Sequence, residues 1–494
     1  MSVFPLFING EFVTTTATNK ISSPSTGEVI TEVSIASASE VDAAISAARA
    51  AFDRGPWGSL PAEKRKTYLL NIAQGILDNA AELADLETRN TGKPIKESTF
   101  MDIPSAARTF EYIAHNFENF LKDAAPKMEA EASCRLLREP MGVAALIVPW
   151  NYPLLIACWK LASALAAGNS VILKPSSLTP LTALVLGRII HAADLPRGAV
   201  NIINGNGDDI GRQICSDARV DLISFTGSNE VGGKIVGFTA GYPKKMIMEL
   251  GGKSASIVMA DADLDVATNC CLCSIFLNQG QMCTAMSRIL VEDKIYEQFV
   301  EIFVAKAKKI KLGRGEDFET QIGPLISQVQ RDKVMGFVEH AVKEGAKVLC
   351  GGKIPNTPGL ENGFFFEPTL IGEVTPEMKI CQEEVFGPVA CLGSFSNEED
   401  AIRQANNTPY ALAASIWTSN QLLAQKMAEK INAGTVWINT YGMFYPEIPY
   451  GGFKQSGFGK ELGREGLLEH TRLKNIITDQ SKDGKPLVNY WYGF

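Results

Sequence analysis

Residues 143–174 read VAALIVPWNYPLLIACWKLASALAAGNSVILK, and this stretch decides the fold. A short apolar run, Val143 to Val148, ends in Pro149-Trp150-Asn151. An apolar helix is expected over 154–167, with Gly168-Asn169 as its stop. A second apolar run, Val171 to Leu173, follows directly. A strand, a helix and a second strand in this order predict a parallel sheet.

The same alternation extends in both directions from this stretch. After it we expect a helix over 179–193 and strands at Val200–Ile203 and Leu222–Phe225; further helices are expected over 262–277, 293–310 and 326–345, separated by short apolar runs. Before it, residues 38–122 have a helical rhythm, and the N-terminus is expected to form two strands that turn at Asn9-Gly10. The prediction is an α/β fold whose parallel sheets are covered by helices on both faces.

Length and composition exclude several classes of protein. A chain of 494 residues is long enough for two or three domains, and its net charge of −8 argues against nucleic-acid binding. We expect no membrane span, because no apolar run reaches about 18 residues, and no signal peptide at the N-terminus. Ten irregularly spaced cysteines indicate reduced thiols and hence a cytoplasmic protein. Cys270, Cys271 and Cys273 lack the partners of a tetrahedral set, so no metal site is expected.

A cysteine stands in an unusual context at Asn278-Gln279-Gly280-Gln281-Met282-Cys283-Thr284. A polar break that contains glycine follows the helix ending near 277, and Cys283 lies just beyond it. If a helix restarts there, its dipole would favour the thiolate and make Cys283 a nucleophile. A buried structural thiol is the alternative. None of the four histidines lies in a catalytic motif.

Other polar groups follow the predicted strands. Glu249 precedes Gly251-Gly252 and could point into a cleft, or it could be a surface residue at a turn. Asn151 follows the first strand, at the edge of an open α/β sheet where ligands bind. The segment Gly227-Ser228-Asn229-Glu230-Val231-Gly232 could present backbone N–H groups to a phosphate, although it is not a G-x-G-x-x-G fingerprint. Lys174 offers a cation after the second strand, unless it is an ordinary solvated lysine.

Together these segments closely resemble the aldehyde dehydrogenase superfamily, in family order and at family spacing. The matching motifs are Pro149-Trp150-Asn151, Gly168-Asn169, Lys174-Pro175-Ser176, Phe225-Thr226-Gly227-Ser228, Glu249-Leu250-Gly251-Gly252-Lys253, Gly280-Gln281-Met282-Cys283, Gly323-Pro324-Leu325, Glu384-Val385-Phe386-Gly387-Pro388 and Ser456-Gly457-Phe458-Gly459. The resemblance implies a Rossmann-like cofactor domain over 1–117 and 141–251. It also implies a second α/β, catalytic domain over 252–455 and a small β oligomerisation arm from 118–140 and 470–490. Because the arm would pair with a neighbouring subunit, a homodimer or homotetramer is expected.

The resemblance also implies roles in catalysis. Cys283 would attack the aldehyde, with the Asn151 amide and the Cys283 N–H stabilising the oxyanion. Hydride transfer would leave a thioester, and Glu249 would activate the water that hydrolyses it. Lys160 and Glu461 match positions that pass protons onward from this base. A CoA-acylating enzyme or a crystallin-like structural protein are the alternatives, and the presence of Glu249 argues against the first.

The resemblance names NAD as the cofactor. Its matched binding positions are Trp150, Lys174, Ser177, Gly227, Ser228, Gly232, Leu250, Glu384 and Phe386, and Glu384 would hold the nicotinamide ribose. NAD-selective relatives often carry Glu at the position of Ser177. Serine removes the repulsion of a 2′-phosphate, so NADP is expected to be tolerated.

The small-molecule aldehyde substrate is predicted from aromatic residues. Tyr152 and Trp159 are seven residues apart and can share a helix face, and Tyr441, Phe444, Tyr445 and Tyr450 cluster before Gly451. Tyr152, Trp159 and Asp102 match betaine-aldehyde and aminoaldehyde dehydrogenases, in which an acid lies at the tunnel mouth. Leu277 and Tyr450 stand where plant members have Trp, and Ser105 replaces a second acid. The expected substrate is an amino- or trimethylammonio-aldehyde bound by cation–π contacts, with aromatic or medium-chain aliphatic aldehydes as the alternative.

Overall fold

The computed structural model describes residues 3–128 and 131–481. The larger of its two main sheets has eight strands. In spatial order the strands are β2 (Glu11–Val13), β1 (Leu6–Ile8), β8 (Val200–Ile202), β7 (Ser170–Lys174), β6 (Val143–Ile147), β9 (Leu222–Thr226), β10 (Lys245–Glu249) and β20 (Gly457–Phe458). The five strands from β8 to β10 are parallel, while β1, β2 and β20 run antiparallel to their neighbours. The predicted strand–helix alternation and the turn at Asn9-Gly10 are therefore confirmed.

Helices cover both faces of this sheet. One face carries α2 (Ala62–Asp78), α3 (Ala80–Thr91), α5 (Ile103–Phe120), α6 (Pro153–Ala167) and α7 (Leu181–Ala192), and the other carries α1 (Ala38–Asp53), α8 (Arg212–Ser216) and α9 (Asn229–Phe238). Along β6, Ala144 and Leu146 pack into the first core, whereas Val143, Ala145 and Ile147 pack into the second. A strand buried on both sides must be apolar throughout, which explains the continuous run that began the sequence analysis.

The second main sheet has seven strands. Its order is β13 (Lys347–Cys350), β14 (Thr369–Gly372), β15 (Val389–Phe395), β12 (Arg288–Glu292), β11 (Ala255–Val258), β17 (Ala413–Trp417) and β18 (Thr435–Ile438), and only β13 is antiparallel. Around it lie α10 (Leu264–Phe276), α11 (Tyr296–Ala307), α12 (Gln328–Lys343), α13 (Lys379–Gln382), α14 (Glu398–Asn406) and α15 (Gln421–Lys430). The α/β class with two parallel sheets is thus as predicted.

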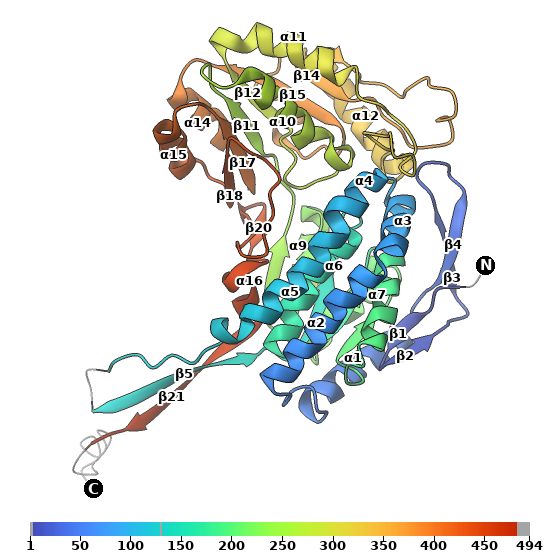
Figure 1. Cartoon of the computed structure of the whole chain (residues 1–494), viewed down its shortest axis with the longest axis vertical. Helices are drawn as coiled ribbons and strands as arrows, with labels where there is room; N and C mark the ends of the chain where they lie inside the picture. Colours follow the sequence, from blue (N-terminus) through green and yellow to red (C-terminus); the bar gives the residue numbers. More distant parts are fainter. Residues whose placement is uncertain (1–2, 129–130, 482–494) are drawn as a thin grey trace.

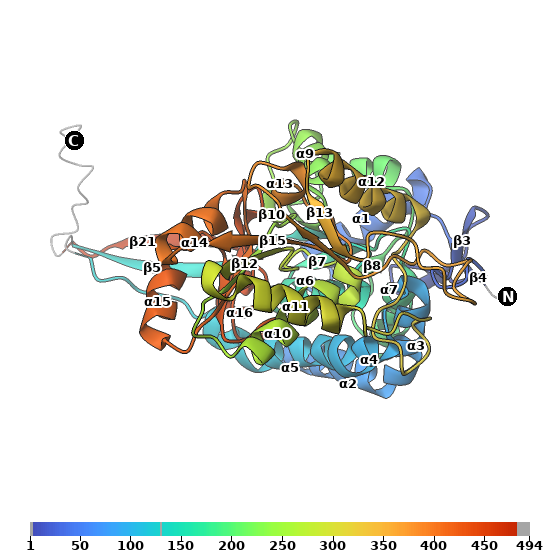
Figure 2. The same ribbon diagram turned by 90° about the horizontal axis from the view of Figure 1, so that it is seen from above.

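A two-stranded arm projects from the body in both views (Figures 1 and 2). Strands β5 (Ala132–Pro140) and β21 (Thr471–Asp479) pair antiparallel along their whole length, and every residue of β21 after Thr471 is exposed. The expected arm reaches residue 490, and its part beyond 481 lies outside the described residues. The domain bounds at 251 and 455 stay predictions.

Shorter elements complete the chain. They are β3 (Thr18–Ser22), β4 (Val29–Ser34), α4 (Ile95–Glu97), β16 (Tyr410–Ala411), β19 (Phe453–Lys454), α16 (Gly463–Glu469), the π-helical turns η1 (Ser98–Asp102) and η2 (Gly207–Gly211), and the 3-10 turns η3 (Leu277–Gly280) and η4 (Asp293–Ile295). In the described ranges, no helix has the length and apolar character needed to cross a bilayer.

Candidate active site

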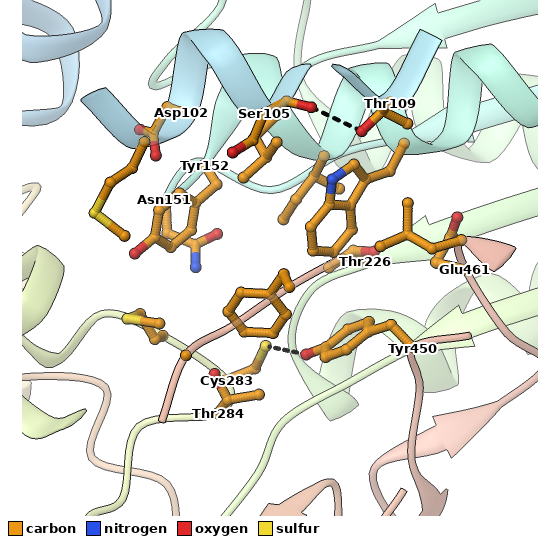
Figure 3. Close-up of a pocket in the computed structure, with 18 of the residues that line it drawn as sticks. Asp102, Ser105, Thr109, Asn151, Tyr152, Thr226, Cys283, Thr284, Tyr450 and Glu461 are labelled. Atoms are coloured by element: carbon orange, nitrogen blue, oxygen red, sulfur yellow. Dashed lines mark hydrogen bonds between the residues drawn. The ribbon is translucent and has the colours of Figure 1, made fainter. Parts of the chain in front are cut away.

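A cavity of ≈ 1050 Å³, including the part open to solvent, lies between the two sheets (Figure 3). Asn151 follows β6, Thr226 ends β9 and Glu249 ends β10, and all three line it. These strands are parallel neighbours, so their carboxyl ends meet at one edge, as expected for ligand sites in open α/β sheets. Cys283 enters from the segment before β12. The structure therefore brings together residues that lie up to 132 positions apart, as Asn151 and Cys283 do.

The segment before Cys283 is a tight turn rather than a helix start. Asn278, Gln279 and Gly280 all have positive φ, at 46°, 57° and 70°. A Cβ at Gly280 would lie 2.2 Å from the carbonyl oxygen of Gly387, so only glycine fits there. After Cys283 the chain continues without a helix to β12.

The expectation of a helix dipole at Cys283 is therefore wrong. Burial instead raises the pKa of the Cys283 thiol to about 12, although a hydrogen bond with Tyr450 acts in the opposite direction. This residue is therefore a thiol in the resting protein, and a neighbouring base or hydrogen-bond donor must help it to lose its proton.

Asn151 is buried and held in a network of polar contacts. Its side-chain amide donates to the carbonyl of Gln281 at 2.8 Å, and the Asn278 amide donates to the Asn151 carbonyl at 3.0 Å. Both oxygens of Glu97 accept the Asn278 backbone N–H, at 3.1 and 3.2 Å. One N–H of the Asn151 amide thus fixes the cysteine segment, and its second N–H remains for a ligand.

Glu249 is a buried carboxyl group, 3% exposed, and neither of its oxygens has a hydrogen-bond partner in the described chain. Burial, and then the negative charge of Glu461, raise the pKa of Glu249 well above its ordinary value. A Cβ at Gly451 would lie 2.3 Å from Glu249 Oε1, so glycine leaves the space that this carboxyl group occupies. The interpretation of Glu249 as a surface residue at a turn is therefore excluded.

Lys160 and Glu461 form a fully buried ion pair beside Glu249. Lys160 Nζ lies 2.5 Å from Glu461 Oε1, and Ser224 Oγ accepts from Lys160 at 2.7 Å while donating to Glu461 at 3.0 Å. Glu461 also lines the cavity. The charges of this pair act on Glu249, since Glu461 raises its pKa and Lys160 lowers it.

Aromatic rings form one continuous wall of the cavity. The Trp159 ring lies 5.5 Å from the Tyr450 ring and 6.0 Å from the Phe444 ring, and Phe444 and Tyr450 are 5.6 Å apart. Tyr152 and Leu277 line the same cavity, whereas Tyr445 is not among the lining residues. Tyr152, which precedes α6, and Trp159 on α6 thus both line the cavity.

Asp102 is not a free acid at the tunnel mouth. It lines the cavity but is only 1% exposed, and its carboxylate accepts from Lys93 Nζ at 2.7 Å. Lys93 also lies 3.8 Å from Glu87 and 4.0 Å from the centre of the Tyr152 ring. Arg108, paired with Glu447 at 2.9 Å, is the charged residue at the exposed part of the lining. The sequence carried no pattern that indicates the role of Lys93, Glu87 or Glu97.

We expect Lys93→Met to lower the free energy of unfolding by about 3–5 kcal/mol, because it leaves buried carboxylates without their cation. Burial already raises the pKa of Glu87 to about 7 and that of Glu97 to about 8, while Lys93 lowers both. Without Lys93 these groups must take up protons in the folded state, so the loss should grow as the pH rises. Urea unfolding, followed by circular dichroism at about pH 6 and about pH 8, measures this loss in the free energy of unfolding.

The matched control is Arg108→Met, which breaks a pair whose side chains are 55% and 42% exposed and should cost about 0–1 kcal/mol. Equal losses in the two variants would show that the Lys93 cluster does not behave as a buried ion cluster.

The positions matched to cofactor binding surround the edge of the first sheet. Ser228 caps α9 by accepting the Val231 N–H at 3.3 Å, and a Cβ at Gly232 would lie 2.8 Å from the Leu250 side chain. Lys174 ends β7, is 5% exposed and donates, among the described residues, only to the Pro175 carbonyl; burial lowers its pKa to about 8. A buried ammonium with no carboxylate partner fits a polar ligand.

The remaining positions of that set are Trp150, Phe386, Glu384, Gly227 and Ser177. Trp150 and Phe386 pack edge to face, with ring centres 5.2 Å apart. Glu384 accepts the Gly252 N–H at 2.9 Å, close to Gly251, and burial raises the pKa of Glu384 to about 7. Gly227 follows β9, and Ser177 is half-buried after β7. In the described part of the chain, no group of three His, Cys, Asp or Glu residues could hold a metal ion.

Comparisons with known proteins agree with this geometry. The model of the Aldehyde dehydrogenase family matches residues 12–476. The chain is 43% identical to betaine aldehyde dehydrogenase of Bacillus subtilis over 99% of both chains. It is also 43% identical to human retinaldehyde dehydrogenase 3, over 95% of this chain and 92% of the relative.

Solved structures are also similar to this chain over almost its whole length. A putative aldehyde dehydrogenase from Burkholderia cenocepacia has a TM-score of 0.96 at 38% identity, over 99% of both chains. A point variant of betaine aldehyde dehydrogenase from Staphylococcus aureus, in complex with NAD+, has a TM-score of 0.96 at 39% identity, again over 99% of both chains. With the family model spanning almost the whole chain, this protein belongs to the aldehyde dehydrogenase family.

Proposed function

We propose that this protein oxidises an aldehyde to a carboxylic acid with NAD, using Cys283 as the nucleophile and Glu249 as the general base. The observation that carries the proposal is the shared cavity of Cys283, Asn151 and Glu249. A thiol, an amide donor and a partnerless buried carboxyl group are the three groups that acyl chemistry on an aldehyde needs.

The steps follow from these groups. Glu249 accepts the thiol proton, and Cys283 Sγ bonds to the aldehyde carbon, whose oxygen becomes an oxyanion stabilised by the Asn151 amide. When bound, NAD supplies the hydride acceptor that turns the thiohemiacetal into a thioester. Glu249 then takes a proton from water, the resulting hydroxide breaks the C–S bond, and the acid leaves while the thiol is restored.

The raised pKa of Glu249 suits this base role, because burial makes its carboxylate a stronger proton acceptor than an exposed one. Lys160 and Glu461 would carry the proton away from Glu249. The Lys160–Glu461 contact at 2.5 Å supports a path through this buried pair.

NAD would bind at the edge of the first sheet. Lys174 and Ser177 would meet the adenosine ribose, Ser228 and the N-terminus of α9 the phosphates, and Glu384 the nicotinamide ribose. The unpartnered Lys174 ammonium and the close packing of Gly232 on Leu250 support this placement. Structural relatives in complex with NAD+ support the choice of cofactor.

A panel of aldehydes assayed with NAD and with NADP tests the proposal. NADH formation with a free acid as product is the expected result. Product that appears only as an acyl-CoA when CoA is added would identify an acylating enzyme, and no NADH with any aldehyde would favour a structural role.

For the cofactor, we expect NADP to be used, with NAD preferred or equal. Ser177→Glu should lower kcat/KM for NADP relative to NAD by about tenfold, because its carboxylate repels the 2′-phosphate. The matched control is Ser177→Gln, which has the same shape without the charge and should leave the ratio near that of the wild type. A wild-type kcat/KM for NADP roughly a thousandfold below that for NAD would contradict this prediction.

For the substrate, we propose an aldehyde that carries a trimethylammonio or amino group. The wall of Trp159, Phe444 and Tyr450 offers several ring faces to a cation. Behind Tyr152, the carboxyl groups of Glu87, Glu97 and Asp102 face the single ammonium of Lys93. Burial and then the charges of Glu97 and Asp102 raise the pKa of Tyr152 well above its ordinary value, so their field reaches the cavity wall.

The sharpest test compares betaine aldehyde with 3,3-dimethylbutanal, which has the same shape but no charge. We expect kcat/KM to favour betaine aldehyde by about 2- to 30-fold, the range of one cation–π contact. The preference should increase with pH as Glu97, whose pKa is about 8, ionises. Trp159→Leu should abolish the preference, while Tyr242→Leu, at an exposed ring, should not.

An uncharged aromatic or medium-chain aldehyde is the second candidate. It is favoured by the pairing of Asp102 with Lys93, which removes a free negative charge from the wall, and by Arg108 at the exposed rim. If the uncharged aldehyde is preferred by about tenfold and Trp159→Leu affects both substrates alike, the rings serve only as an apolar wall.

We also propose a homodimer or homotetramer in which β5 and β21 pair with a neighbouring subunit. The exposure of β21 supports this, because a strand at the edge of a sheet is prone to pair with another chain. All ten cysteines are free, which supports a reducing, cytoplasmic setting.

A further inference from the structure

Tyr450 is held rigidly beside the nucleophile. Its backbone exchanges two hydrogen bonds with Glu461, Tyr450 N–H to Glu461 O at 2.7 Å and Glu461 N–H to Tyr450 O at 2.8 Å. Its ring is 7% exposed and packs against Trp159 and Phe444. These backbone hydrogen bonds and ring contacts define the position of the hydroxyl group.

The hydroxyl group of Tyr450 lies 3.1 Å from Cys283 Sγ and points directly at it (Figure 3). Among the described residues, this is the side-chain hydrogen bond of the Cys283 sulfur, whose own backbone N–H also helps to lower its pKa. The Asn151 amide is already turned to the carbonyl of Gln281. The phenol is thus the polar neighbour that the sulfur has before a ligand enters.

We propose that Tyr450 is a catalytic residue, whose hydroxyl group donates a hydrogen bond to Cys283 Sγ, stabilises the thiolate and aims it at the cavity. This inference rests on the proposed role of Cys283 as the nucleophile. No helix begins at Cys283, so the usual source of thiolate stabilisation is missing, and the phenol takes its place. The carboxyl group of Glu249 removes the thiol proton, and the phenol keeps its own.

The direction of the hydrogen bond follows from the surroundings. Burial, and the negative charges of Cys283 and Glu249, raise the pKa of Tyr450 well above its ordinary value, so the phenol stays protonated. A protonated phenol beside a thiolate donates. When the C–S bond forms, the charge leaves sulfur for the aldehyde oxygen and the hydrogen bond weakens. When the thioester is hydrolysed, the bond forms again and stabilises the departing thiolate.

Tyr450→Phe tests this directly, because it removes one oxygen and keeps the aromatic wall. The measurement is the rate of Cys283 alkylation by iodoacetamide between about pH 7 and 9, without aldehyde or NAD. We expect alkylation about three- to tenfold slower throughout this range, the loss of thiolate being partly offset by its greater nucleophilicity.

The matched control is Tyr441→Phe. The Tyr441 hydroxyl belongs to the same loop and donates to the Thr284 carbonyl at 3.4 Å, but it has no recorded contact with sulfur. Its removal should leave the alkylation profile unchanged. If Tyr450→Phe is alkylated as fast as the wild type or faster, or if Tyr441→Phe is slowed equally, Tyr450 is only part of the wall and the inference is overturned.

The experiments distinguish a failure of this inference from a failure of the proposed function. If Cys283→Ala still oxidised aldehydes, the proposed nucleophile would be wrong. Slower alkylation of Tyr450→Phe would then still show that the Tyr450 hydroxyl group acts on the Cys283 thiol, but without a role in catalysis. If Tyr450→Phe is alkylated at the wild-type rate and Cys283→Ala is inactive, Cys283 remains the nucleophile and only the proposed role of Tyr450 is wrong.

Discussion

Cys283→Ala is expected to form NADH roughly 10⁴-fold more slowly than the wild type, because it removes the one thiol among the residues that line the cavity. The reason is geometric: Cys283 is the cysteine that lines the cavity with Asn151 and Glu249. Initial rates of NADH formation with a saturating aldehyde measure the loss.

The matched control is Cys273→Ala, which removes an exposed thiol on α10 and should leave the rate unchanged. Near wild-type turnover in Cys283→Ala would refute the covalent scheme.

Glu249→Gln is expected to lower the steady-state rate by about 10²–10⁴-fold, the usual contribution of a general base. The amide has the same shape but cannot take a proton from water, so the thioester should accumulate. In the wild type the rate should rise with pH as Glu249, whose pKa is raised by burial, loses its proton. This dependence should disappear in the variant.

Rapid mixing separates the two half-reactions. Glu249→Gln should show a fast burst of NADH, close to one equivalent per active site, and then a slow phase. Glu465→Gln, at an exposed carboxylate on α16, is the control and should behave as the wild type. If the variant gives no burst, Glu249 is required before hydride transfer, as the base for the Cys283 thiol.

Much of the fold could be predicted because each element is locally determined. Residues 154–167 form α6 over Pro153–Ala167, with Gly168 in the left-handed conformation that ends a helix. The apolar run at Val143 becomes a strand because it is buried on both faces. The pairing of β5 with β21 joins segments more than 330 residues apart, and only the family resemblance indicated it.

The site was predicted in part. Asn151 and Glu249 line one cavity because strand ends converge in a parallel sheet, whereas Cys283 reaches it from the segment before β12, which only the motif order indicated. The helix expected after Cys283 was wrong, because the chain runs from Cys283 to β12 without a helix and the left-handed turn of Asn278 to Gly280 lies before the cysteine. The pairing of Asp102 with Lys93 and the contact of Tyr450 with sulfur are long-range contacts, and no local pattern in the sequence encodes them.

The intact mass of Glu249→Gln, recorded after mixing with an aldehyde and NAD, tests the central claim most directly. The account predicts an increase equal to the aldehyde less two hydrogens, located on the peptide that contains Cys283, and absent in Cys283→Ala. An unmodified protein that still forms NADH and acid, or the same adduct on another residue, would contradict the account.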